Sequence, residues 1–224
     1  KETPRPLANQ PGGDFLITPD SSALAIAQGE GLAIIPLQPQ EQSTSKPLDF
    51  LPKFGMVLSF ARDGSQAAMV KFNKDYTRSL FLVTNQGVQK EVFRIQGSIL
   101  SAQFDWQKQK LYCLLTRVLP GEIYQEQPYV AIVDIKTGKL TPWVALPIQQ
   151  GIQMSLAPDG LALLLDQAVT ASDSQSSGLR NIEGKGIATS RIWLLPIVGG
   201  DGETQAKVQP EALPLLGLYP RWLP

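Results

Sequence analysis

The sequence contains no histidine and a single cysteine, Cys113, among its 224 residues. Without histidine, the usual general base for a serine or cysteine nucleophile is missing. The commonest zinc ligand is missing as well, and one cysteine builds neither a zinc site nor an intrachain disulfide. We therefore predict no catalytic residues, no metal site and no cofactor. Cys113 lies in the apolar stretch Leu111–Leu115, which predicts a buried thiol with a structural role.

Charge and long apolar runs are also scarce. Charged residues make up 18% of the chain, 20 basic residues balance 20 acidic ones, and lysine and arginine form no run. Phosphate binding needs a basic surface, so nucleic acid is not an expected partner. No run of 18 apolar residues occurs, so direct insertion into a membrane is not expected either. Residues 1–14 are rich in proline and glycine, as linkers are, and predict a domain that follows another domain or an anchor.

One strand–turn–strand unit recurs four times along the chain. Its turns are centred on Asp20, Asp63, Asp105 and Asp159, which are separated by 43, 42 and 54 residues. In three of the four copies serine or glycine follows the aspartate, which is typical of a tight turn. Periods of about 40–50 residues are typical of four-stranded propeller blades. We interpret the four aspartates as turn residues, not as a cluster of catalytic carboxylates.

Each unit continues with a third strand and a weaker fourth strand. The third strands are expected at residues 32–35, 80–84, 130–135 and 192–195. No segment of ten or more residues has helical periodicity. The chain is therefore predicted to be all-β, with residues 15–224 forming a β-propeller of four to five four-stranded antiparallel blades. A fifth copy begins at Leu218 and either completes a blade with the N-terminal strands, closing a small ring, or belongs to a larger propeller.

The turns resemble a known repeat family. Leu156–Gly160 (LAPDG) and Phe60–Gly64 (FARDG) are similar to the "WSPDG" core of TolB-type (PD40/WD40-like) propeller repeats, and Pro220–Pro224 (PRWLP) resembles the "PxWSP" that enters such a repeat. The first aromatic position departs from the family pattern, because phenylalanine or leucine replaces tryptophan. The resemblance implies a propeller that gates or binds and contributes no catalytic residues. It also implies a domain of a larger, extracytoplasmic bacterial protein.

The second-to-third-strand loops provide the candidate binding residues. These loops lengthen along the chain and emerge on one face of a propeller, and insertions confined to one face often mark a binding surface. Tyrosine and arginine are enriched at binding hot spots. The predicted surface residues are Tyr76, Arg78, Arg117, Tyr124, Glu126, Tyr129, Arg180 and Arg191. Solvated hairpins without a ligand are the alternative, since long surface loops cost little stability.

Three functions remain open from the sequence. We expect a monomeric, non-enzymatic propeller domain that binds a protein or peptide of unknown identity. A carboxylate- or metal-dependent enzyme acting on carbohydrates or lactones is the first alternative, although the expected innermost strands carry almost no acidic residues. A structural spacer without a ligand is the second. The tryptophans Trp106, Trp143, Trp193 and Trp222 fall on or beside predicted strands, so packing between blades is expected.

Overall fold

The computed structural model describes residues 15–28, 31–37, 51–52, 54–149, 151–170, 187–197 and 209–222. The expected linker, residues 1–14, lies outside the described part. The described residues contain strands and turns and no helix, which confirms the all-β prediction. It follows that none of them belongs to a helix long and apolar enough to cross a membrane.

The described strands form four antiparallel sheets, here called blades 1 to 4. Blade 1 contains β1 (Phe15–Ile17), β2 (Ala23–Gln28) and β3 (Gly31–Pro36). Blade 2 contains β4 (Met56–Phe60), β5 (Gln66–Phe72), β6 (Arg78–Thr84) and β7 (Gln89–Ile95). Blade 3 contains β8 (Ile99–Phe104), β9 (Lys110–Val118), β10 (Glu126–Asp134) and β11 (Leu140–Ala145). Blade 4 contains β12 (Met154–Leu156), β13 (Ala162–Thr170), β14 (Ile187–Pro196) and β15 (Glu211–Ala212).

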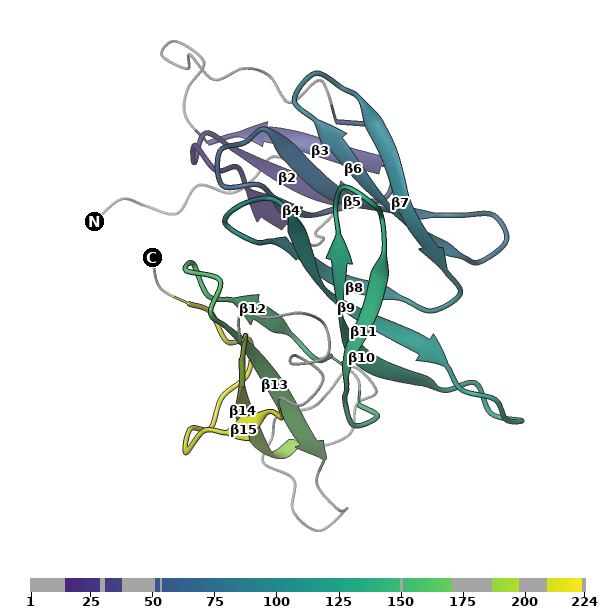
Figure 1. The fold of residues 1–224 in the computed structure, drawn as a ribbon, viewed down its shortest axis with the longest axis vertical. Coiled ribbons are helices and arrows are strands. Elements are labelled where there is room, and N and C mark those ends of the chain that lie inside the picture. The colour runs from purple at the N-terminus through teal and green to yellow at the C-terminus, as the bar shows by residue number, and fades with distance from the viewer. Residues whose placement is uncertain are drawn as a thin grey trace.

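The blades follow one another as in a propeller. Within each sheet the strands are ordered as in the chain, and neighbouring blades contact mainly through the innermost strands β1, β4, β8 and β12. Figure 1 shows the four sheets in sequence, from purple through teal to yellow, with blades 1 and 4 at the two ends of the series. This arrangement confirms a four-bladed β-propeller, with strands paired as the repeat predicted.

The aspartates form the turns between the first and second strands of the blades, as predicted. In blade 2 the Asp63 carboxylate accepts hydrogen bonds from the backbone N–H and the hydroxyl of Ser65, at 3.1 and 2.7 Å. The residue after Asp63 is Gly64, with φ of +68°, a conformation that glycine adopts without strain. In blade 1 Ser21 takes the equivalent place with φ of +57°. The same local chemistry therefore closes the turn even where serine replaces glycine.

Three apolar clusters join the four blades. Because side chains alternate along a strand, β9 serves two of them. Cys113 and its neighbours at alternate positions face blade 2, whereas Tyr112 and Leu114 face blade 4. The third cluster, which contains Ala25 and Met69, joins blades 1 and 2. Cys113 is fully buried, as predicted, and burial raises the pKa of its thiol.

Hydrogen bonds between innermost strands connect consecutive blades. The Ser59 hydroxyl of β4 donates to the Ala102 carbonyl of β8 at 2.5 Å. Gln103 of β8 binds β12 twice: its amide nitrogen donates to the Met154 carbonyl at 2.9 Å, and its amide oxygen accepts from the Leu156 N–H at 2.8 Å. Blades 2 and 3, and blades 3 and 4, are thus held in register near the propeller axis.

The terminal segment after β15 lies against blade 4. The indole N–H of Trp222 donates to the Ser155 carbonyl of β12 at 3.0 Å, and the Tyr219 N–H donates to the Asp166 carboxylate at 2.8 Å. Residues 213–222 contain no strand, and within the described residues they do not pair with the sheet of blade 1. Of the two arrangements expected for this segment, completion of a blade with the N-terminal strands is therefore not seen in the described part of the chain.

Candidate functional site

The loops between the second and third strands of blades 2 and 3 bring several predicted binding residues together. The first loop spans residues 73–77 and the second spans residues 119–125. Strand β9 continues to Val118, and β10 begins at Glu126, before the expected residue 130, so Arg117 and Glu126 lie on strands. The loops themselves carry Tyr76, which has φ of +63°, and Tyr124. Tyr76 is 85% exposed and Tyr124 is 71% exposed.

Glu126 is the polar centre of this region. Its carboxylate accepts hydrogen bonds from the hydroxyl of Thr116, at 2.5 Å, and from the hydroxyl of Tyr124. Burial raises the pKa of Glu126, but these hydrogen bonds, one from Ser98 and the charge of Arg78 outweigh it, so the net pKa is lowered. The bond to Glu126 is also the main reason why the pKa of Tyr124 is raised. The ionised carboxylate of Glu126 therefore holds Tyr124 in place by accepting a hydrogen bond from its hydroxyl.

Arg78 links the two loops. Its guanidinium donates to the Tyr76 carbonyl at 2.8 Å and lies over the ring of Phe72, 4.8 Å from the ring centroid. Its positive charge also acts on Tyr124 and Glu126 of blade 3. The attraction between a cation and an aromatic face stabilises this position of the guanidinium, and the hydrogen bond to the backbone carbonyl adds to it. Arg78 is thereby fixed against the loop of blade 2, with its charge close enough to act on the loop of blade 3.

Exposed apolar side chains occur on the same two hairpins as Glu126 and Arg78. We call them the loop-face patch, which consists of Phe72, Tyr76, Val118, Ile123 and Tyr124. All five belong to the second-to-third-strand hairpins of blades 2 and 3, or to the strand ends beside them. Phe72, Val118 and Ile123 were not among the predicted residues. The signal that could have found them is an apolar residue directly before each loop, Phe72 or Val118, and an apolar residue next to the loop tyrosine, Ile123.

The remaining predicted residues lie elsewhere. Arg117 is exposed on β9 and donates to the Gln127 side chain. Tyr129 is half-buried and packs against the cluster between blades 2 and 3, so it supports the core. Arg191 is exposed on β14 of blade 4 and not in a loop. Arg180 lies outside the described residues, as does most of the long loop that was expected to contain it.

The Glu126 carboxylate makes a pH-dependent contribution to the stability of the fold, and the substitution Glu126→Gln should remove it. We expect this substitution to lower stability by about 1 kcal/mol at pH 7, because it replaces a charged acceptor at a partly exposed site. The pKa of Glu126 is lowered, so its contribution is present above the ordinary value of 4.5 and lost as pH falls through the folded-state pKa. Thermal unfolding of both proteins between pH 7 and pH 3 measures the difference. Glu122→Gln, on the same loop and exposed, is the matched control and should change little.

A cavity of about 440 Å³ lies on the propeller axis. Its walls come from the innermost strand of every blade, and its rim includes Trp106 and Pro158 from the first-to-second-strand turns. Arg62 and Arg221 also line it. Neither arginine was among the predicted site residues, because the turn repeat was interpreted as structural throughout. Trp106, expected between blades, is 65% exposed, and its ring lies 3.4 Å from where a Cβ would stand at Gly160.

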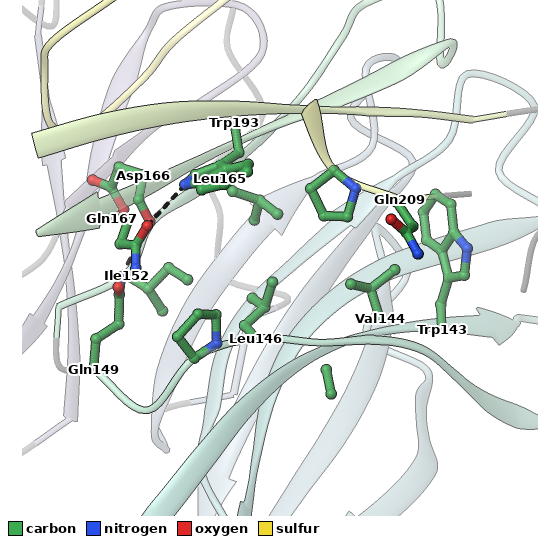
Figure 2. A pocket seen from close by; sticks show the side chains of 13 residues that line it. Trp143, Val144, Leu146, Gln149, Ile152, Leu165, Asp166, Gln167, Trp193 and Gln209 are labelled. Atoms are coloured by element: carbon green, nitrogen blue, oxygen red, sulfur yellow. Dashed lines mark hydrogen bonds between the residues drawn. The ribbon is translucent and has the colours of Figure 1, made fainter. Parts of the chain in front are cut away.

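A second cavity, of about 420 Å³, lies between blades 3 and 4. Figure 2 shows Trp193 and Trp143 on different sides of it, with Asp166 and Gln167 beside Trp193. Trp143 and Trp193 pack against the cluster between these blades, as predicted for tryptophans. Asp166 is 2% exposed, and burial raises its pKa although backbone N–H groups of Tyr219 and Gln153 donate to it. Its carboxylate therefore serves to join the segments around blade 4.

The described residues include no group of three or more acidic or cysteine side chains that could hold a metal ion. The axial cavity has one carboxylate among its described lining residues, that of Asp105. This carboxylate accepts the backbone N–H groups of Gln109 and Lys110, at 2.7 and 2.9 Å, and closes its own turn. The arrangement can recognise a ligand through apolar and guanidinium groups.

Comparison with known proteins identifies the fold. No protein-family model and no curated protein sequence matches the chain. An acylaminoacyl peptidase from Pyrococcus horikoshii is similar in structure, with a TM-score of 0.53 and 14% identity over 87% of this chain and 30% of that one. An acylaminoacyl peptidase in complex with Z-Gly-Gly-Phe-chloromethyl ketone gives a TM-score of 0.50 and 12% identity over 85% and 30%. The chain thus spans about a third of the length of these peptidases.

TolB from Acinetobacter baumannii is also among the similar structures, as the turn repeats predicted. Its TM-score is 0.46, with 16% identity over 84% of this chain and 39% of that one. At these identities the likeness concerns the fold alone.

Proposed function

We propose that this propeller domain binds a protein or peptide segment through the loop-face patch and performs no catalysis of its own. The observation that carries the proposal is the exposure of Tyr76, Ile123 and Tyr124 on adjoining loops, at 85, 75 and 71%. Apolar side chains gathered on a surface and framed by polar groups are typical of protein interaction sites. Tyrosine anchors of this kind contribute a large contact area at a low cost in conformational entropy.

The polar frame supports the same function. Glu126 and Arg78 hold Tyr124 and Tyr76 before any partner arrives, and a preorganised surface loses less entropy on binding. The missing histidine removes the commonest general base, and the carboxylate nearest the patch, Glu126, already accepts hydrogen bonds from Thr116 and Tyr124. The proposal places the domain in a larger extracytoplasmic protein, which is what the TolB-type repeats imply.

Selection from a displayed library of random peptides tests the proposal. We expect peptides that bind the protein to lose at least about tenfold in affinity for the triple variant Tyr76→Ala, Ile123→Ala, Tyr124→Ala, since such anchors dominate binding energy. The matched control is Val88→Ala with Leu161→Ala, two exposed apolar residues on turns at the opposite ends of their strands. Equal binding to the triple variant and to the wild type would remove the loop-face patch as the site. A library that yields no binder would favour the spacer function.

A further inference from the structure

Two arginines line the axial cavity and have no ionic partner among the described residues. Arg62 follows β4, Arg221 belongs to the segment after β15, and both are exposed where they line the cavity. Neither guanidinium makes an ion pair or a hydrogen bond with any residue that the structure describes. Two segments far apart in the chain thus bring two positive charges to one opening, and no described residue pairs with either.

Apolar side chains form much of the cavity wall, beside the polar side chains of Ser59 and Gln103. Leu16, Leu58, Phe60, Phe104 and Leu156 line it, one or two from each innermost strand, and each is partly exposed. An apolar group placed among them would remove these side chains from water, which is favourable in proportion to the area covered. The cavity volume of about 440 Å³ lies within the range that small-molecule and cofactor sites occupy.

The charges at the cavity favour an anion. Asp105 is the only carboxylate among the described lining residues, and its Oδ1 is bound by backbone N–H groups of its own turn. The two arginines therefore exceed the acidic charge. Trp106, beside Asp105, adds an exposed ring at the rim. A guanidinium fork binds a carboxylate through paired hydrogen bonds, which a lysine does not reproduce.

We propose that the axial cavity binds an apolar ligand that ends in a carboxylate. Arg62 and Arg221 bind the carboxylate, and the leucine and phenylalanine side chains of the walls enclose the apolar body. The cavity between blades 3 and 4 differs in chemistry, because its described lining includes no basic side chain and its carboxylate, Asp166, already accepts two backbone N–H groups. The anionic ligand is therefore assigned to the axis.

Isothermal titration calorimetry with defined probes tests the assignment. The probes are the peptide acetyl-Leu-Leu-Phe as the free acid, the same peptide as its C-terminal amide, octanoate, and inorganic phosphate. We expect the free acid to bind and the amide to bind at least about tenfold more weakly, because the amide lacks the charge that the guanidinium groups recognise. Similar affinities for acid and amide would overturn the proposal.

Variants locate the binding on the arginines. The double variant Arg62→Gln, Arg221→Gln keeps most of each side-chain stem, and we expect it to weaken binding of the free acid at least about tenfold. Lys136→Gln with Lys139→Gln removes the same charge from exposed positions beside β11 and should bind as the wild type does. Unchanged binding by the arginine variant would also overturn the proposal, provided that its circular dichroism spectrum matches that of the wild type.

Two further comparisons are needed. One distinguishes a peptide terminus from a free carboxylic acid as the ligand, and the other distinguishes the axial cavity from the loop-face patch. Tighter binding of the peptide acid than of octanoate would identify a chain terminus, and the reverse a free carboxylic acid; both support the shared chemistry. Binding of inorganic phosphate as tightly as the peptide acid would contradict the role of the apolar walls. The triple variant of the loop-face patch should retain carboxylate binding, because the patch belongs to the second-to-third-strand loops and the cavity rim to the opposite turns.

Discussion

Replacing Gly55 with alanine is expected to destabilise the protein by about 3–5 kcal/mol, from steric overlap and backbone strain together. Gly55 precedes β4, the innermost strand of blade 2, and has φ of +61°. A Cβ at this position would stand 1.7 Å from the carbonyl oxygen of Val70 on β5, far inside any real contact. Because the obstacle is the backbone of a buried strand, the first pair of strands in blade 2 would have to separate.

Urea unfolding followed by circular dichroism measures this loss, and Gly64→Ala is the matched control. Gly64 has φ of +68°, but no atom lies within 4 Å of the place where a Cβ would stand, so only backbone strain of about 1 kcal/mol is expected. The two substitutions share their chemistry and backbone region and differ in the space available. Equal losses for both would show that the close approach of Gly55 to Val70 does not limit stability.

Replacing Gln103 with leucine is expected to cost about 2–4 kcal/mol, because two backbone groups of β12 lose their partners. The Gln103 amide serves the Met154 carbonyl and the Leu156 N–H at once, 2.9 and 2.8 Å away. Leucine fills a similar volume but offers neither donor nor acceptor. The substitution therefore removes the polar connection between blades 3 and 4 while it keeps an apolar body at the interface.

Gln107→Leu provides the control for this experiment. Gln107 is exposed on the turn that follows β8, so its replacement should change stability by no more than about 0.5 kcal/mol. Chemical unfolding of both variants gives the comparison. A loss for Gln103→Leu no larger than that for Gln107→Leu would mean that water replaces the amide without penalty, and that apolar packing alone joins these blades.

The blades and turns could be predicted from the sequence because their causes are local. An aspartate carboxylate that binds the N–H two residues later, as at Asp20, Asp63 and Asp159, needs no distant partner. The period between the turns follows from the length of four strands. The third strands were also found where expected, and β6, β10 and β14 include nearly all of the predicted residues.

The extent of β10 was wrong for a physical reason. The third strand of this unit was expected to begin at residue 130, after Pro128, and proline is rarely found inside a sheet. The strand begins at Glu126, and the Pro128 carbonyl accepts from the Leu146 N–H at 2.9 Å, on the side where β11 ends. In an antiparallel pair the N–H and C=O of one residue point to the same side. The missing N–H of Pro128 therefore faces the end of the ladder and not β9.

The axial arginines could not be predicted because their proximity depends on the whole ring. Arg62 and Arg221 are 159 positions apart, and nothing in either local sequence shows that both side chains reach the same cavity. The exposure of Trp106 was missed for a similar reason: an aromatic residue beside a strand predicts packing, but this one lies at the rim. To predict a site between blades, one must know how the repeats are placed relative to one another, and the repeat pattern in the sequence does not give this.

The three apolar clusters have a consequence for cooperativity. Among the described residues they join blade 1 to blade 2, blade 2 to blade 3, and blade 3 to blade 4, so the inner pair of blades has two neighbours each and the outer pair one. Stability in such a series is a sum of unit and nearest-neighbour energies. The free energy of local opening is therefore graded, with amide protons of blades 2 and 3 protected longest from exchange. The loop-face patch lies on this most protected pair, so a partner would bind where the domain opens least.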